Sequence, residues 1–187
     1  MDATSSSVSS NDPYADWELE LQKYLDFLVE SDKTEDLVAV LRAQLYLEIE
    51  LANLLAANDP KASLNRRAGS DAKLKKAEKA GLLDAGECAT FREINHLRNR
   101  FAHLPIKHAV DENDLALLEA TLPPKFTEAV AVYPAKNIFR EHDLKTPSAK
   151  VRIILLVVFN WLCSRAAAKR PLANMTGAED PGLFAAP

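Results

Sequence analysis

Residues 72–103 read AKLKKAEKAGLLDAGECATFREINHLRNRFAH, and this stretch decides the fold class. The lysine-rich segment 70–80 is typical of a helix, and Gly81 stands where a glycine commonly ends one. Residues 82–86 then form a short corner. A second helix is expected from about 87 to 104. The pattern predicts two helices joined by a tight corner, with no strand between them.

The composition of the whole chain agrees with a helical fold. Its 187 residues and 20.6 kDa are the size of one medium domain. Hydrophobic residues make up 48% and charged residues 27%, which excludes disorder over the whole chain. Five glycines are too few for the turns of a β-sandwich or barrel, or for a glycine-rich phosphate loop. We therefore expect an all-α, up-and-down helical bundle at 14–170, a disordered N-terminus at 1–13 and a flexible C-terminal tail at 171–187.

Apolar residues recur at helical spacing in three further long segments. These expected helices cover residues 14–30, 37–56 and 149–170. The last of them is strongly apolar and is expected to pack against the helix at 37–56. Residues 106–147 are interpreted as an irregular excursion before the last helix, with one short helix at 112–120. Pro123 and Pro124 are interpreted as helix breakers.

Charge is distributed unevenly along the chain. Residues 1–60 carry 13 acidic and 3 basic side chains, whereas residues 61–187 carry 14 acidic and 20 basic ones. The stretch 61–79 alone holds seven basic side chains against two acidic ones. Such a cluster attracts phosphates. It is equally explained as a solvated helix face, or as a partner for the acidic N-terminal part.

The cysteines and the hydropathy pattern favour the cytoplasm. Cys88 and Cys163 lie far apart, without the spacing of a disulfide framework, and the N-terminus does not resemble a signal peptide. The longest apolar run, even extended to 153–163, is shorter than the about 20 residues that span a bilayer. We expect a cytoplasmic protein with inert thiols and no membrane partner.

The helix at 87–104 has two distinct faces. At about 100° per residue, an apolar stripe lies nearly opposite a polar one. The polar stripe consists of Arg92, His96, Asn99 and His103. It combines a cation, an amide and two groups that titrate near neutral pH, which suits a site or an interface. A wet helix surface or a dimer seam explains the same residues.

Common catalytic motifs are absent from the sequence. It contains no HExxH, no paired CxxC, no GxxxxGK[ST] and no GxSxG. We therefore expect neither a metal nor a cofactor.

Residues 72–103 close on Arg98, Asn99 and His103 and resemble the helix-corner-helix signature of the HEPN superfamily, in its mannitol-repressor-like branch. Residues 27–55 resemble the first core helix of that branch. The resemblance implies a HEPN-like bundle that dimerises, so that two copies of the motif face each other across a cleft. Many HEPN proteins are metal-independent endoribonucleases at this place and act as toxins or defence effectors. RNA and a cognate antitoxin or regulatory protein are the partners that it implies.

RNA carries its own nucleophile, the 2'-hydroxyl, so cleavage needs a group that moves protons and a cation beside phosphorus. On the resemblance, His103 is the expected acid or base, Arg98 the phosphate clamp and Asn99 the orienting group. The expected substrate-binding residues are Arg92, His96, Lys73 and Lys76. Arg98 lies about 140° around the helix from His103, so its long side chain or a second subunit must close the gap.

A non-catalytic function is the alternative. Pro105 stands where HEPN toxins paired with a nucleotidyltransferase antitoxin often have an adenylylated tyrosine, and the mannitol-repressor-like relatives are regarded as transcription-associated regulators. The chain would then bind a protein or a nucleic acid without turnover. Two smaller hypotheses concern the surroundings of the motif: Glu48 pairs with Arg98 if their helices touch, and His108 lines the same cleft.

Overall fold

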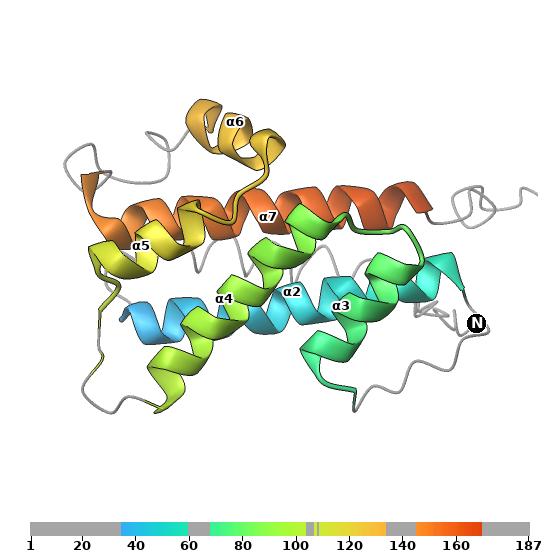
Figure 1. Ribbon diagram of the computed structural model, residues 1–187, viewed down its shortest axis with the longest axis horizontal. Helices are drawn as coiled ribbons and strands as arrows, with labels where there is room; N and C mark the ends of the chain where they lie inside the picture. The colour runs from blue at the N-terminus through green and yellow to red at the C-terminus, as the bar shows by residue number, and fades with distance from the viewer. Residues whose placement is uncertain (1–34, 60–67, 104–106, 108, 134–144, 170–187) are drawn as a thin grey trace, which may run out of the picture. The chain divides into compact units, whose positions relative to one another are not determined.

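The computed structural model describes residues 35–59, 68–103, 107, 109–133 and 145–169 (Figure 1). In this part the chain forms six helices and no strand, so the all-α prediction is confirmed. The helices are α2 (Asp36–Asn58), α3 (Ser70–Lys79), α4 (Ala85–His103), α5 (Glu112–Glu119), α6 (Pro124–Val132) and α7 (Pro147–Lys169). The predictions for residues 1–30, for His108 and for 171–187 lie outside the described residues.

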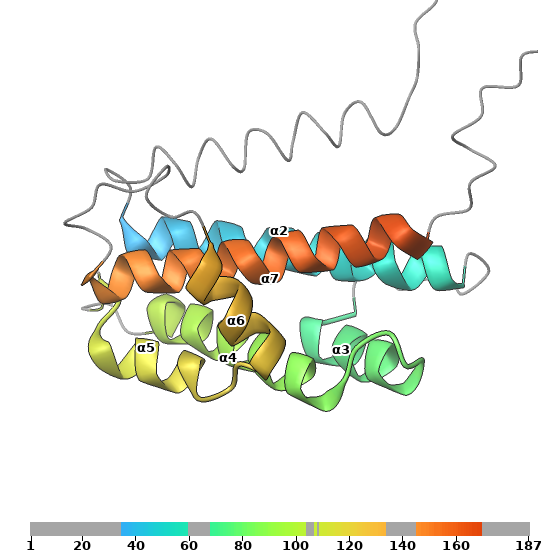
Figure 2. The same cartoon turned by 90° about the horizontal axis from the view of Figure 1, so that it is seen from above.

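The core is built on α2 and α7, which lie side by side and run in the same direction (Figures 1 and 2). Every residue of α7 from 151 to 159 is buried, as a helix that is apolar on all sides requires. The predicted packing of the last helix against 37–56 is confirmed. By length and composition α7 could also cross a membrane, but 61% of its apolar window is buried inside the protein, as in a core helix.

A buried ion pair joins the first turns of these two helices. Asp36 accepts a hydrogen bond of 2.8 Å from Arg152 Nη2 and another from the hydroxyl of Ser148. The backbone N–H of Val110 donates a third, also of 2.8 Å. Asp36 and Arg152 are both buried. The contacts fix α2, α7 and the segment before α5 to one another.

The remaining long helix, α4, lies with α3 and α5 on one side of the α2–α7 pair (Figure 2). Ile94, Leu97 and Phe101 are buried and form its inner face. Its first turn is fixed by a capping box: Asp84 accepts from the N–H of Glu87 at 2.8 Å, and Glu87 accepts from the N–H of Asp84 at 2.7 Å. The position of α4 in the fold is thus set both by packing and by its cap.

Lys125 binds both carboxylates of this capping box. The side chain of Glu87 is fully buried and also binds Arg165 at 3.2 Å. Lys125 and Arg165 both lie over the ring of Trp161, at 5.1 and 4.8 Å from its centroid. The pKa of Asp84 is lowered, chiefly by its hydrogen bond with Lys125. The start of α4 is therefore joined to α6 and α7.

The corner between α3 and α4 has the backbone that the sequence predicted. Gly81 has a φ of 65°. Its N–H donates to Glu78 O, and the N–H of Leu82 donates to Ala77 O at 2.9 Å, which is the Schellman arrangement of a helix C-terminus. A short connection over residues 80–84 leads from α3 into α4.

Replacing Gly81 by alanine is expected to lower the free energy of unfolding by about 1–2 kcal/mol, because a left-handed backbone strains any residue with a Cβ atom. The substituted Cβ would meet no other atom within 4 Å, so the loss reports backbone strain alone. Urea denaturation measures it. Asparagine tolerates this conformation better, so Gly81→Asn serves as the control and should retain more stability. Equal losses for the two variants would contradict the explanation.

The structure corrects one prediction for the stretch 106–147. The short helix expected at 112–120 is present as α5 and ends before Pro123 and Pro124, but a further helix, α6, follows directly where an irregular segment was expected. Pro124 is the first residue of α6 instead, a position where proline is favoured because it needs no N–H partner and its φ already suits a helix. Phe126 is the one buried residue of α6, and its ring packs edge-on against Trp161 at 5.4 Å.

Candidate functional site

The polar stripe predicted for the central helix lies on the face of α4 that points away from its buried residues. His96 and His103 are exposed, and Arg92 and Asn99 are partly exposed. We call these four residues the outer face of α4. The apolar stripe packs inward, so the prediction that this helix has one apolar and one polar face is confirmed. The outer face is available to a ligand or to another protein.

Arg98 differs from the other two arginines of α4. Arg92 and Arg100 each bind two carboxylates. Arg98 binds no carboxylate in the described part of the chain, and its Nη1 donates to Asn99 Oδ1 at 3.0 Å. Its Nε is buried and has no hydrogen-bond acceptor there. A buried N–H without an acceptor costs free energy. Arg98 is also the arginine of α4 whose charge no described carboxylate balances, and its side chain is partly exposed.

The contact with Asn99 carries Arg98 part of the way around the helix. Asn99 lies about 40° around the helix from His103 and about 6 Å from it along the axis. Asn99 therefore stands between the cation and the histidine, on the same side as His103. The hydrogen bond to Asn99 thus brings the guanidinium of Arg98 towards the side of the helix that carries His103.

Lys73 lies in a different environment from the one that the sequence suggested. It is buried and forms an ion pair of 2.5 Å with Glu48 on α2, which also accepts from Gln44. Lys73 is therefore not an exposed phosphate contact. The hypothesis that Glu48 pairs with Arg98 is wrong, because Lys73 of α3 occupies that carboxylate.

The exposed positive charge of α3 lies on other lysines. Lys75, Lys76 and Lys79 are exposed, and Lys75 pairs with Asp71 at 2.9 Å. This pairing is the main cause of the lowered pKa of Asp71. Lys76 and Lys79 have no carboxylate partner within the described ranges, so they are free to bind phosphate.

Arg92, a predicted substrate contact, forms ion pairs with two carboxylates of α3. It binds Glu78 at 3.2 Å and Asp71 at 3.6 Å. The basic surface of α3 therefore adjoins the outer face of α4.

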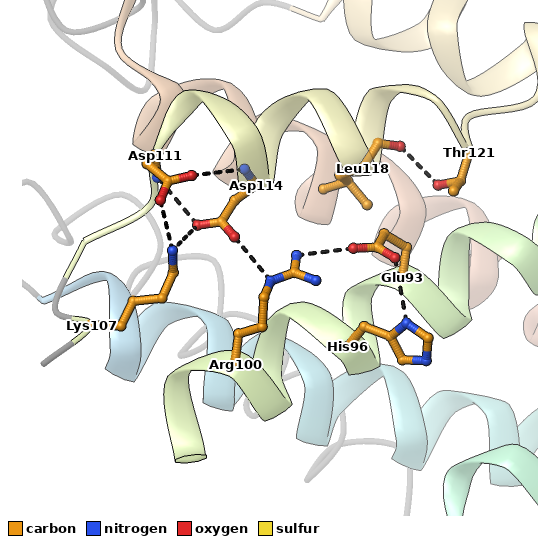
Figure 3. Close-up of polar contacts among 8 residues, drawn as sticks. All are labelled: Glu93, His96, Arg100, Lys107, Asp111, Asp114, Leu118 and Thr121. Atoms are coloured by element: carbon orange, nitrogen blue, oxygen red, sulfur yellow. Dashed lines mark hydrogen bonds and ion pairs between the residues drawn. The ribbon is translucent and has the colours of Figure 1, made fainter. Parts of the chain in front are cut away.

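A network of ion pairs between α4 and α5 was not predicted (Figure 3). Arg100 binds Glu93 Oε1 at 2.9 Å and Asp114 Oδ1 at 3.0 Å. Asp114, whose side chain is 1% exposed, also binds Lys107 at 2.7 Å. Asp111 forms a capping box with Asp114. The Asp-x-x-Asp spacing at 111–114 was the available signal for the cap, but no spacing pointed to Arg100.

The partners of Lys107 in this network change its pKa. Burial lowers the pKa of Lys107, but the hydrogen bonds to Asp111 and Asp114 outweigh it, so the pKa is raised overall. The pKa of Asp111 is lowered, first by its hydrogen bond with Lys107. Both shifts favour the charged forms of the pair. The contact that joins α5 to α4 is the ion pair between Asp114 and Arg100.

His96 joins this network at its exposed end. Its Nδ1 lies 3.5 Å from Glu93 Oε2, and its side chain is 64% exposed (Figure 3). Nε2 is the ring nitrogen not engaged by Glu93.

Both cysteines are buried, Cys88 on α4 and Cys163 on α7. Burial raises the pKa of Cys88 to about 11, so it stays protonated at neutral pH, which agrees with an inert thiol. Among the described residues, no group of three His, Cys, Asp or Glu side chains could hold a metal ion.

A second surface feature lies on α2. Leu45 and Ile49 are 56% and 53% exposed, one turn apart. They border an open groove of about 510 Å³. The groove is lined by Leu45, Glu48, Ile49, Ala52, Asn53 and Lys73. We call it the α2 groove.

Comparisons with protein-family models, with curated proteins and with solved structures give no match to this chain.

Proposed function

We propose that this protein is a HEPN-type, metal-independent endoribonuclease of the cytoplasm, a toxin or defence effector that works as a homodimer. The observation that carries the proposal is the state of Arg98. It is the α4 arginine without a carboxylate partner in the described chain, it binds Asn99, and its buried Nε lacks an acceptor. A phosphodiester is an anion that would balance the charge of this guanidinium.

The proposed reaction uses the nucleophile of the RNA itself. A base removes the proton of the 2'-hydroxyl, the 2'-oxygen attacks phosphorus, and the bond to the 5'-oxygen breaks. The products are a 2',3'-cyclic phosphate and a 5'-hydroxyl, without consumption of water. His103 is the proposed base, and Arg98 stabilises the charge that develops on the phosphoryl oxygens. Asn99 orients the guanidinium through their hydrogen bond.

Two features support a dimer and RNA binding. Arg98 and His103 start about 140° apart on one helix, and a second copy facing the outer face of α4 would bring an arginine of one protomer towards the histidine of its partner. Lys75, Lys76 and Lys79 give α3 an exposed basic surface that adjoins this face. Each phosphate contact steepens the salt dependence of RNA binding.

The test is incubation of the purified protein with mixed cellular RNA, with and without EDTA. The variant Arg98→Ala, His103→Ala is expected to lose cleavage by a factor of about 10²–10⁴, because it lacks the acid-base group and the phosphate clamp. The protein should cleave equally well in EDTA. Lys150→Ala removes an exposed charge from α7 and is the control, which should cleave like the wild type. Absence of cleavage by the folded wild-type dimer across several RNAs would contradict the proposal.

A second candidate function is favoured by the α2 groove. Exposed apolar side chains beside a groove are typical of a surface that binds another protein. On this reading the chain is a non-catalytic regulator, similar to the mannitol-repressor-like branch. Binding of a protein partner would change little with salt. Binding of RNA would weaken steeply with salt, and less steeply after Lys76→Gln, Lys79→Gln.

A further inference from the structure

Cleavage through the 2'-hydroxyl needs two proton transfers, one from the nucleophile and one to the leaving 5'-oxygen. His103 accounts for one. The outer face of α4 carries a second exposed histidine, His96, seven residues earlier on the same side of the helix. The two lie about 10 Å apart along the axis, so both can reach one phosphodiester from the same surface.

His96 stands at the end of a chain of charged groups that leads out from a buried carboxylate (Figure 3). Asp114, at the buried end, binds Arg100 at 3.0 Å, and Arg100 binds Glu93 Oε1 at 2.9 Å. The other oxygen of Glu93 lies 3.5 Å from His96 Nδ1. Each group is therefore held on both sides, except for the imidazole at the exposed end.

The fixed position of Glu93 distinguishes this contact from an ordinary surface pair. Exposed ion pairs contribute little because two flexible side chains must be ordered. Here the side chain of Glu93 is only 13% exposed, and Arg100 already orders it. The ordered carboxylate therefore offers Nδ1 of the ring a fixed acceptor, as a buried aspartate does for a catalytic histidine. The distance of 3.5 Å is long for a hydrogen bond, as is common before substrate binds.

We propose that His96 is the general acid of the reaction and that Glu93 is its positioning residue, an inference that rests on the proposed ribonuclease function. Glu93 accepts a hydrogen bond from Nδ1–H and leaves Nε2–H directed at the substrate. As the bond between phosphorus and the 5'-oxygen breaks, the Nε2 proton passes to that oxygen. His103 has taken the proton of the 2'-hydroxyl, so the enzyme gains one proton and loses one in each turnover.

The decisive experiment compares two substrates of one sequence. The first has a natural linkage, and the second has sulfur in place of the bridging 5'-oxygen. The thiolate leaves without a proton, so a general acid is not needed for the second substrate. His96→Ala is expected to lose about 10²–10⁴-fold in kcat on the natural linkage and less than about tenfold on the sulfur linkage. His103→Ala should lose activity on both.

The two outcomes that contradict the proposals are distinct. A wild-type protein that cleaves neither substrate overturns the ribonuclease function and the role of His96 with it. If the wild type cleaves both substrates, and His96→Ala either cleaves the natural linkage at the wild-type rate or loses equally on both, only the assignment of His96 falls.

Nitrogen-15 NMR tests the role of Glu93 independently of catalytic activity. In the wild type, neutral His96 is expected to carry its proton on Nδ1, and in Glu93→Gln, which removes the charge, the commoner Nε2 form should dominate. Glu93→Gln should also lower kcat and leave KM unchanged. A wild-type His96 with its proton on Nε2 would overturn the positioning role of Glu93.

Discussion

Replacing Asp36 by alanine is expected to lower the free energy of unfolding by about 3–5 kcal/mol, because it breaks the buried ion pair with Arg152. The same change removes the acceptor for Ser148 and for the N–H of Val110. The first turns of α2 and α7 would then lose their polar connection. Chemical denaturation followed by circular dichroism measures the loss.

The matched control for this prediction replaces both charges. Asp36→Leu with Arg152→Met removes both members of the buried pair, and replacements of a buried ion pair by apolar residues are often neutral or stabilising. The double variant should therefore recover most of the stability that Asp36→Ala loses. A double variant less stable than Asp36→Ala would mean that the apolar pair does not fit between the two helices.

Replacing Phe126 by alanine is expected to lower the free energy of unfolding by about 3 kcal/mol, at the low end for loss of a buried phenylalanine. The reason is that Phe126 is the one buried residue of α6 and packs against Trp161. In the variant, α6 can separate from α7, so the loss of the ring does not leave a closed cavity between them. Hydrogen exchange should therefore show that the amides of α6 lose protection before those of α7 do.

Val132→Ala is the control within the same helix. Val132 is 80% exposed, so its truncation should change the free energy of unfolding by less than about 0.5 kcal/mol. If protection were lost equally in all helices of Phe126→Ala, α6 would be part of the cooperative core and the interpretation would be wrong.

The helical parts of the fold follow from local signals in the sequence. Gly81 ended α3 as predicted because only a glycine meets the left-handed backbone at that corner without strain. The two faces of α4 followed from its 3.6-residue period, which places Leu97 inside and His96 outside. Properties that depend on one helix alone can be read from its own residues.

What the sequence could not predict depends on contacts between helices. Lys73 is charged and was expected at the surface, but Glu48 on another helix stabilises it in a buried position. Arg100 has no distinguishing local spacing, because its partner Asp114 comes from α5. The start of α6 was missed for a different reason: Pro124 was read as a breaker, although proline also favours the first position of a helix.

The pairing of α2 with α7 also has a consequence for folding during synthesis on the ribosome. Asp36 and Arg152 are 116 residues apart in the chain. At about 5–20 residues per second, a ribosome needs on the order of ten seconds to make the residues between them. Throughout that time the apolar face of α2 has left the ribosome without its principal neighbour. The nascent chain therefore cannot complete its core as it emerges, and it presents to chaperones the surface that α7 later covers.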